Sequence, residues 1–379
     1  MRSLYFDYNA TTPVHPRVRD AMLPWLTERF GNPGSAHYWG WEARQGLDRA
    51  RHQVASAIGA RDEEVVFTSG ATESNNLALY GVLTQPGNQH LVISAVEHPA
   101  IREPARNLER QGLRLSIVPV TRDGSVRLED VQAVCNEQTT MISIMLANNE
   151  VGTLQPIGRI AAWARTQGII IHTDAAQAVG KIPVQVKELG VDLMSMAGHK
   201  LYAPKGIGGL FIRNGVRVTP RIRGGGQERG LRPGTEMMPA IMGFGAACAM
   251  IGDVEEEGRR QRGLGERLRQ GLAGLGRAFC IHAEGAQRLP GTLSVGFPGL
   301  RAGDIVGRLA EYKVGVSAGA ACHAGEESVS AVLEAMKVEK EKALGTVRFS
   351  WGRMTTVEDV DALLERLQTV LNVSTDFHR

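Results

Sequence analysis

The sequence predicts an α/β protein with a large, mostly parallel sheet and a smaller α+β domain. Between Glu64 and Ile212, short apolar runs typical of buried strands alternate with helical patterns. Such alternation indicates a parallel sheet with helices on both faces. The C-terminal part alternates differently, and a chain of 379 residues is too long for one ordinary core. We therefore expect two domains.

The predicted elements follow the chain in order. A short strand from Leu4 leads into a polar turn that ends at Pro13, and the elements of the large domain follow: helices Val18–Phe30 and Tyr38–Ile58, strand Val65–Thr68, a helix from Glu73 to Tyr80, strand His90–Ala95, helix Ala100–Gln111, strand Leu113–Val118, helix Leu128–Val134, strand Met141–Leu146, helix Ile157–Gln167, and strands Gly168–Ile171 and Val191–Met196.

The C-terminal elements begin with one long helix from Pro239 to Arg277, or two helices broken near Gly263–Gly265. The small domain is expected to contain strands Leu293–Phe297, Val314–Ser317 and Val347–Trp351, and helices Ala302–Glu311, Ser328–Met336 and Val357–Val370.

Composition restricts the classes of function. Apolar residues make up 43% and charged residues 22% of the chain, and the net charge of +3 is small. Acids alternate with lysines and arginines, so neither nucleic acid nor an anionic membrane is an expected partner. The N-terminus has no apolar signal segment, and we expect a cytoplasmic protein. The four cysteines show no CxxC or Cys/His pairing, so we expect no metal site and no disulfide framework.

Two residues at strand ends indicate a cofactor. Asp174 follows one apolar run and Lys200 follows the next, so both should lie at the edge of the sheet where ligands bind in open α/β proteins. Small, glycine-rich sequence after Lys200 would allow a flat ligand to approach. We predict that Lys200 forms a Schiff base with pyridoxal 5′-phosphate and that Asp174 pairs with the pyridinium nitrogen.

Further candidates follow other strands. The turn Ser69–Thr72 opens a helix and suits a phosphate, although a plain helix cap explains it equally well. His98 and the pair Asn148–Asn149 could be structural loop residues, but they are expected at the same edge as Thr72.

Two loops complete the candidates. The segment 223–236 carries three consecutive glycines and several arginines; it is either a flexible charged loop or a phosphate-contacting segment that reaches into a neighbouring subunit. Small residues flank Cys322 on both sides, so a mobile loop with a nucleophilic thiolate is favoured over a buried, inert cysteine.

Together these motifs resemble a known family, the class V aminotransferase-like, pyridoxal-phosphate-dependent cysteine desulfurases of the NifS/IscS kind. The resemblance covers nearly the whole chain and is carried, in order, by the segments 7–13 (DYNATTP), 67–75 (FTSGATESN), 148–152 (NNEVG), 172–177 (HTDAAQ), 198–200 (GHK), 232–235 (RPGT) and 348–350 (RFS). Each motif alone is weak to moderate, but seven in the same order are specific.

The resemblance implies fold type I, the aspartate-aminotransferase-like fold. It also implies an N-terminal arm (1–14) that packs with the small domain, a large cofactor-binding domain (15–245) and a small domain (246–379) that carries the cysteine loop. A homodimer with shared active sites and a protein sulfur acceptor, such as an Fe–S scaffold, are the implied partners.

The resemblance also assigns residue roles. Lys200 would bind the cofactor covalently, His98 would stack on its ring and help to move protons, Asp174 would pair with the ring nitrogen, and Gln177 would bind the ring hydroxyl. The phosphate would be held by Ala71, Thr72 and His199, together with Thr235 of the second subunit. Asn149 and Arg348 would hold the substrate carboxylate, and Cys322 would accept sulfur as a persulfide while L-cysteine becomes L-alanine.

Two positions depart from the family pattern. Many members have a serine where this chain has Ala197, which offers no hydroxyl to the phosphate. The sequence Ala-Ala-Cys-His around Cys322 also resembles selenocysteine lyases, which act on L-selenocysteine. Selenocysteine lyase therefore stays open as an alternative, with an ordinary class V aminotransferase as a weaker one. A nicotinamide enzyme is disfavoured because no GxGxxG follows the first strand.

Overall fold

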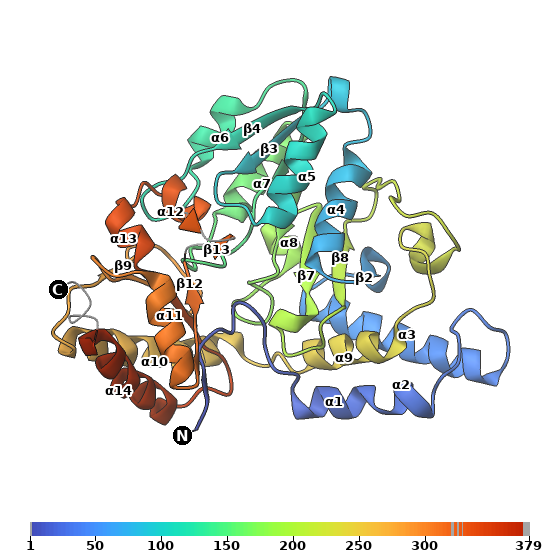
Figure 1. Ribbon diagram of the computed structural model, residues 1–379. Coiled ribbons are helices and arrows are strands. Elements are labelled where there is room, and N and C mark those ends of the chain that lie inside the picture. Colours follow the sequence, from blue (N-terminus) through green and yellow to red (C-terminus); the bar gives the residue numbers. More distant parts are fainter. Residues whose placement is uncertain (1, 320–321, 324–325, 328, 374–379) are drawn as a thin grey trace.

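The computed structural model describes residues 2–319, 322–323, 326–327 and 329–373. Its centre is a seven-stranded sheet in the order β2-β8-β7-β6-β5-β3-β4 (Figure 1). The strands are β2 Val65–Thr68, β3 His90–Ser94, β4 Arg114–Val118, β5 Thr139–Ser143, β6 Ile170–Asp174, β7 Leu193–Ala197 and β8 Gly208–Ile212. Only β8 runs antiparallel to its neighbours β2 and β7. The prediction of a mostly parallel sheet is therefore confirmed.

Helices cover both faces of this sheet, because successive strand residues point to opposite sides. Val65 and Phe67 of β2 pack into one hydrophobic cluster, whereas Val66 between them packs into another. The helices and short helical turns of this part are α3 Tyr38–Ala57, η1 Asp62–Glu64, α4 Ala71–Val82, η2 Pro86–Asn88, α5 Pro99–Arg110, α6 Leu128–Val134, α7 Ile157–Thr166, α8 Val186–Leu189, η3 Gly198–Lys200, η4 Gln227–Gly230 and α9 Met238–Ala249.

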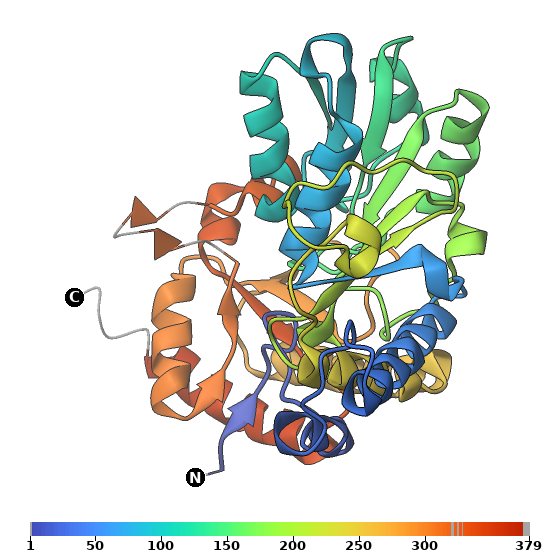
Figure 2. The ribbon, with the colours of Figure 1, turned by 90° about the vertical axis from the view of Figure 1, so that its right-hand side faces the viewer.

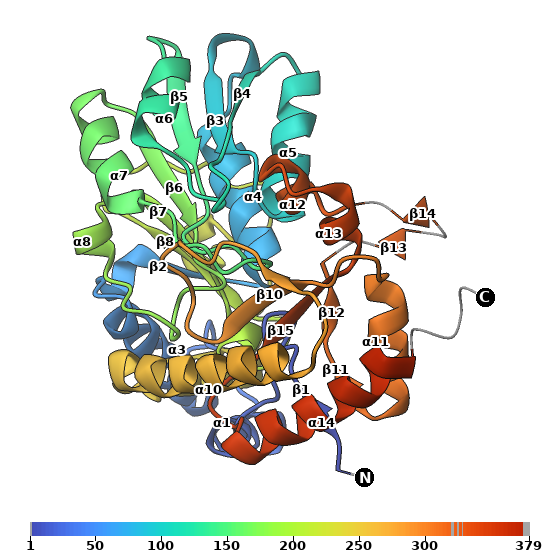
Figure 3. The same cartoon turned by 90° about the vertical axis from the view of Figure 1, so that its left-hand side faces the viewer.

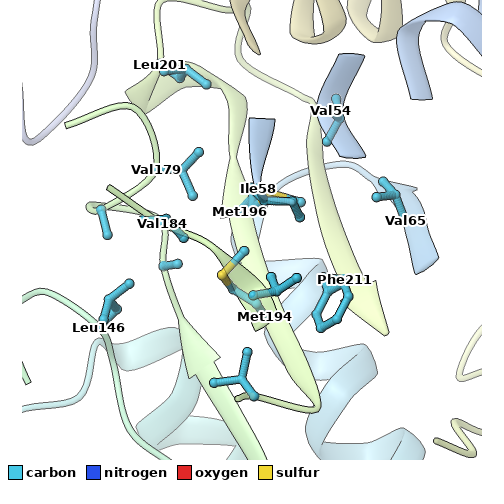
Figure 4. Close-up of a cluster of buried hydrophobic side chains, with 14 of the residues drawn as sticks. Val54, Ile58, Val65, Leu146, Val179, Val184, Met194, Met196, Leu201 and Phe211 are labelled. Carbon is cyan, nitrogen blue, oxygen red and sulfur yellow. The ribbon is translucent and has the colours of Figure 1, made fainter. Parts of the chain in front are cut away.

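The larger cluster lies between the sheet and α3, α6, α7 and α9. Figure 4 shows part of it, with labelled side chains from α3, β2, β7 and β8. The opposite face is covered by α4 and α5. Both faces of the sheet are therefore buried under helices.

The helix predicted from Val18 to Phe30 is wrong. The structure has α1 (Pro16–Met22) and α2 (Pro24–Thr27), which meet at Leu23. Pro24 has no N–H to donate to the preceding turn, so the first helix cannot continue through it. Between β6 and β7 the chain is mostly irregular, since α8 has only four residues.

Both alternatives for residues 239–277, one long helix and two helices broken near Gly263–Gly265, are also wrong. Helix α9 ends at Ala249, and α10 (Val254–Gly274) begins after Asp253, whose carboxylate accepts hydrogen bonds of 2.9 Å from two backbone N–H groups of its first turn. Gly265 instead allows close packing, because a Cβ there would lie 2.8 Å from the Trp351 ring. Among the described residues no single helix is long and apolar enough to cross a membrane; α9 and α10 meet that criterion only as a pair bent by 84°.

The C-terminal part has its own antiparallel sheet, in the order β12-β15-β10-β9. Its elements are β9 Cys280–Ile281, β10 Thr292–Gly296, α11 Ala302–Glu311, β11 Val314–Gly315, β12 Ser317–Ala318, β13 Cys322–His323, β14 Glu326–Glu327, α12 Ala331–Ala335, α13 Lys340–Leu344, β15 Thr346–Ser350 and α14 Val357–Val373. Helices α10 and α14 pack against each other along it (Figure 3).

The N-terminal arm joins this C-terminal part. Figure 2 shows the N-terminal strand β1 (Leu4–Tyr5) beside the C-terminal part, where it pairs in parallel with β11. Leu4 and Phe6 belong to the hydrophobic cluster of the small sheet. The predicted strand Val314–Ser317 is split, because β11 pairs with the arm while β12 pairs with β15. The arm then continues from the small sheet to the ends of the large-sheet strands.

Candidate active site

A cavity of about 710 Å³ lies beside the ends of β6 and β7, at the N-terminus of α4. Most of the predicted site residues line it, although they come from distant parts of the sequence. These are Ala71, Thr72, His98, Asn149, Asp174, Gln177, His199, Lys200 and Arg348. The tertiary structure therefore brings together side chains that the sequence placed on separate strand ends.

The N-terminus of α4 forms one wall. Gly70 precedes the helix with φ +154°, a conformation that side chains rarely adopt, and a Cβ built there would meet no atom within 4 Å. The first N–H groups of a helix lack partners within the helix, and the helix dipole favours an anion beside them. With Ala71, Thr72 and His199 at the same cavity, this wall is suited to a phosphate group.

Asp174 ends β6 and is buried, with 6% of its surface exposed. Its Oδ2 accepts a hydrogen bond of 2.7 Å from Asn75 Nδ2, and its Oδ1 accepts one of 2.9 Å from the Ala176 N–H. These two donors orient the carboxylate. A fixed anion at this position can hold a proton on a ring nitrogen.

Lys200 lies in the short helical turn after β7. Its Nζ donates to the backbone oxygens of Asn9 (2.5 Å) and Ala10 (2.6 Å) in the N-terminal arm. Desolvation and the nearby Arg348 lower the pKa of Lys200 to about 8, although Asp7 and Asp174 act in the opposite direction. A substantial fraction of Lys200 is therefore neutral near physiological pH, as a nucleophilic or basic amine must be.

The two cavity histidines are neutral at physiological pH. Desolvation, Lys200 and Arg102 lower the pKa of His98, against the opposing effect of Asp174. His98 Nδ1 accepts a hydrogen bond of 3.1 Å from the Ala100 N–H, which assigns the ring proton to Nε2. Desolvation and the neighbouring lysines lower the pKa of His199 to about 4.

Arg348, on β15, carries a positive charge to the opposite side of the cavity. Its Nη2 donates to Asp7 Oδ1 (2.6 Å) and Ser317 Oγ (3.0 Å), and its Nη1 donates to the Asn149 backbone oxygen (2.9 Å). The Nε atom is buried and has no partner among the described residues. The guanidinium group nevertheless lines the cavity, where its fixed charge favours a carboxylate.

Two predicted residues stand apart from this group. Thr235 is exposed and is absent from the cavity lining, so in a single chain it does not contact the site. The side chain of Cys322 lies outside the described residues; its backbone forms β13, which pairs antiparallel with β14.

Several residues of the site were given no role by sequence reasoning. Asn9 and Asp7 lie within the motif 7–13, and Asn75 lies within the motif 67–75, so motif membership was the signal that could have marked them. Lys181 had no such signal, because it is one lysine among many and its partners become visible only in the fold.

Comparison with known proteins connects this geometry to a family. The aminotransferase class-V model matches residues 4–363. The chain belongs to the aminotransferase class-V family. A protein of Rickettsia akari named cysteine desulfurase IscS is 42% identical over 366 residues, covering 94% of this chain and 88% of that protein. A solved NifS-like protein superposes with a TM-score of 0.92 at 37% identity, covering 98% of this chain and all (100%) of that chain.

A third relative is a structure titled SspA in complex with cysteine. It is 33% identical with a TM-score of 0.83, covering 93% of this chain and 100% of that chain. The fold of the present chain is fold type I, and enzymes of the class-V family use pyridoxal 5′-phosphate.

The residues at the cavity fit that cofactor. A phosphate needs exposed N–H groups at a helix N-terminus, which α4 supplies behind Gly70. A pyridine nitrogen needs a buried carboxylate, which Asp174 supplies, and covalent attachment needs an amine of lowered pKa, which Lys200 supplies. The class-V family thus accounts for the donor set of the cavity.

Proposed function

We propose that this chain is a cysteine desulfurase that converts L-cysteine to L-alanine and transfers the sulfur to Cys322. The observation that carries the proposal is the cavity in which Lys200, Asp174 and Arg348 meet, in a chain whose relatives bear the name cysteine desulfurase. Bound pyridoxal phosphate would supply an electron sink that stabilises negative charge at the reacting substrate carbon.

We propose that Arg348 and Asn149 hold the substrate carboxylate. Arg348 lines the cavity and is held in place by Asp7, Ser317 and the Asn149 backbone, so its guanidinium charge is oriented for an amino-acid carboxylate. This arrangement fixes the α-amino acid so that its α-carbon faces Lys200. The SspA structure, titled as a complex with cysteine, supports this substrate class.

Lys200 and His98 are proposed to move protons. The lowered pKa of Lys200 leaves part of it as a free amine that can take the α-proton of the substrate. Neutral His98 with its proton on Nε2 can donate a proton and receive it back. Asp174, held by Asn75 and the Ala176 N–H, stays oriented throughout.

Cys322 is proposed as the sulfur acceptor. Its thiolate would attack the substrate sulfur, forming an S–S bond while the substrate Cβ–S bond breaks. The electron pair of the broken bond stays with the substrate Cβ, which takes a proton to become the methyl group of alanine. The sulfur remains on Cys322 as a persulfide, for transfer to a protein acceptor such as an Fe–S scaffold.

The alternatives predict different products. A selenocysteine lyase would prefer L-selenocysteine, and the names of the relatives do not favour it. An ordinary aminotransferase would not need Cys322. A cytoplasmic location stays a prediction.

The decisive experiment measures alanine release and a sulfur adduct on Cys322 by mass spectrometry, with L-cysteine as substrate. Cys322→Ala should abolish both, whereas Cys280→Ala, a change at a half-buried cysteine on β9, should retain them. Alanine release from cysteine that persists unchanged in Cys322→Ala would contradict the proposed sulfur acceptor.

We also propose a homodimer with shared sites. Phe30, Tyr38, Trp39 and Trp41 are exposed, and the rings of Phe30 and Trp39 stack with centroids 6.5 Å apart. Exposed aromatic clusters of this kind are typical of protein interfaces. Burial of this surface against a second copy would allow the loop around Thr235 to reach the partner's phosphate wall.

The dimer is tested by the mass in solution. Trp41→Glu should lower the mass to that of a monomer and reduce activity, and a fully active wild-type monomer would contradict the proposal.

For the domain division we propose the arm 1–14, the large domain 15–245 and the small domain 246–379. The pairing of β1 with β11, and the packing of Leu4 and Phe6 in the cluster of the small sheet, support assigning the arm to the small domain.

A further inference from the structure

Lys181 is a partly buried lysine that does not line the cavity, and nothing in the proposed reaction uses it. It follows Gly180, whose φ is +75° and at which a Cβ would lie 2.1 Å from the Leu201 side chain. Only glycine lets this turn pack against the segment that carries Lys200. The turn therefore brings the Lys181 amine to the underside of the cavity.

The Lys181 amine bridges two side-chain amides. Its Nζ donates to Gln177 Oε1 at 2.6 Å and to Asn9 Oδ1 at 3.0 Å. Gln177 Nε2 donates in turn to the Asn9 backbone oxygen at 2.9 Å. The three residues form a closed hydrogen-bonded triangle next to Lys200, which bonds the same Asn9 oxygen.

Backbone carbonyls determine which way both amides point. A carbonyl oxygen can only accept, so the Gln177 atom facing the Asn9 oxygen must be Nε2, and its Oε1 must face Lys181. Asn9 is oriented likewise, because its Nδ2 donates to the Asn149 backbone oxygen (3.2 Å) and to Thr292 Oγ1 (2.9 Å). Both amide oxygens thus face the amine.

The protonation state of Lys181 does not alter this arrangement. Burial, followed by the charges of Lys200 and Arg348, lowers the pKa of Lys181 well below its ordinary value. A neutral amine has two N–H groups, one for each amide oxygen, and an ammonium has three. In either state the amide oxygens are satisfied, and a side chain without donors would leave two of them unpaired.

One N–H of the Gln177 amide is left over. Nε2 carries two hydrogens, of which the Asn9 oxygen takes one, and Gln177 lines the cavity. We propose that Lys181, together with Asn9, is a positioning residue that holds the Gln177 amide so that its remaining N–H donates to the ring hydroxyl oxygen of the cofactor. This inference rests on the cofactor site proposed above.

The arrangement favours the ionised form of the ring oxygen. An N–H donor stabilises an oxygen anion more than a neutral hydroxyl, because charge-assisted hydrogen bonds are the stronger ones. Loss of the Lys181 donors would leave Gln177 Oε1 unpaired, so only the Asn9 backbone oxygen would hold the amide and its remaining N–H would be positioned less firmly. The ionisation that changes the cofactor absorbance should then need a higher pH.

The test is an absorbance titration of the purified holoenzyme against pH, without substrate. Lys181→Met should raise the titration midpoint by about one pH unit, the effect of losing one charge-assisted hydrogen bond. Lys181→Gln, which keeps an N–H₂ donor, should restore at least half of this shift. Lys187→Met, at an exposed lysine on α8, should leave the midpoint unchanged.

A double-mutant comparison separates positioning from a direct effect of charge. If Lys181 acts through Gln177, then Lys181→Met should add nothing to the shift produced by Gln177→Ala. Additive shifts, or an unchanged midpoint in Lys181→Met, would overturn the inference. If Lys181→Met does not fold, Lys181→Gln is compared with Gln177→Ala in the same way. A midpoint shift in the double variant equal to the sum of the two single shifts would again overturn the inference.

The titration also distinguishes this inference from the proposed function. No L-cysteine is added in the titration, so the absorbance of a holoenzyme that releases no alanine would still change with pH. Conversely, a working desulfurase in which Lys181→Met left the midpoint unchanged would refute only the positioning role.

Discussion

The lowered pKa of Lys200 makes a quantitative prediction about cofactor capture by the apoenzyme. Only a neutral amine attacks an aldehyde, so the rate of capture should follow the neutral fraction of Lys200. With a pKa of about 8, about one tenth of Lys200 is neutral at pH 7. With the ordinary value of 10.5 the fraction would be roughly one in 3,000, so the lowered pKa should make capture at pH 7 about 300-fold faster.

Substitution of Arg348 tests whether the charge of this residue helps to lower the pKa of Lys200. Its charge is the second contribution to the lowered pKa, after desolvation. Arg348→Met removes that charge and also frees Asp7, which is bonded to Arg348 at 2.6 Å and favours the charged lysine. Both changes raise the pKa of Lys200, by about one unit in total, and capture at pH 7 should slow about tenfold.

The assay mixes apoenzyme with pyridoxal phosphate and follows the absorbance change over a range of pH. Arg159→Met, a change at an exposed arginine on α7, is the matched control and also corrects for ionisation of the free cofactor. A wild-type midpoint near the ordinary lysine value, or the same midpoint in Arg348→Met as in the control, would refute the reasoning.

Three further predictions concern the site and the fold. Asp174→Asn should retain bound cofactor, by absorbance, but lower the rate of alanine formation by at least about 100-fold, because a neutral amide cannot keep the ring nitrogen protonated. Glu228→Gln should lower the free energy of unfolding in urea by about 3 kcal/mol, because Glu228 forms a buried two-point ion pair with Arg51 at 2.6 and 2.8 Å. Glu63→Gln, at an exposed position, should have little effect on it. Burial lowers the pKa of the His282 imidazole to about 4, so this group binds a proton more readily in the unfolded chain. The free energy of unfolding should therefore fall as the pH drops from about 6.5 to about 4. In thermal unfolding measured against pH, His282→Gln should reduce this dependence of stability on pH.

Sequence reasoning predicted much of the site because its chemistry is local. Asp174 and Lys200 follow apolar runs that become adjacent parallel strands, and adjacency at one sheet edge follows from the β–α alternation. The turn at Gly70 likewise carries its signal in three or four neighbouring residues. Motif order then supplied the family, which the comparisons confirm.

Errors arose where helix breaks depend on contacts. Glycines inside α10 suggested a break, but Gly265 is required by the Trp351 ring, whose position 86 residues later no helical pattern contains. The break instead lies at Asp253, where a side-chain cap competes successfully with continued helix.

The sequence by itself determined the mostly parallel sheet, the cofactor class and a set of candidate site residues, because hydrophobic periodicity and short motifs are carried by neighbouring positions. Only the tertiary structure decided how those residues are held. The arm residue Asn9 bonds partners at positions 149, 177, 181, 200 and 292. Lys181 reaches Gln177 within its own segment, but it bonds Asn9 only because the arm packs beside it. Hydrogen bonds between such distant residues depend on folded geometry, which no local pattern encodes.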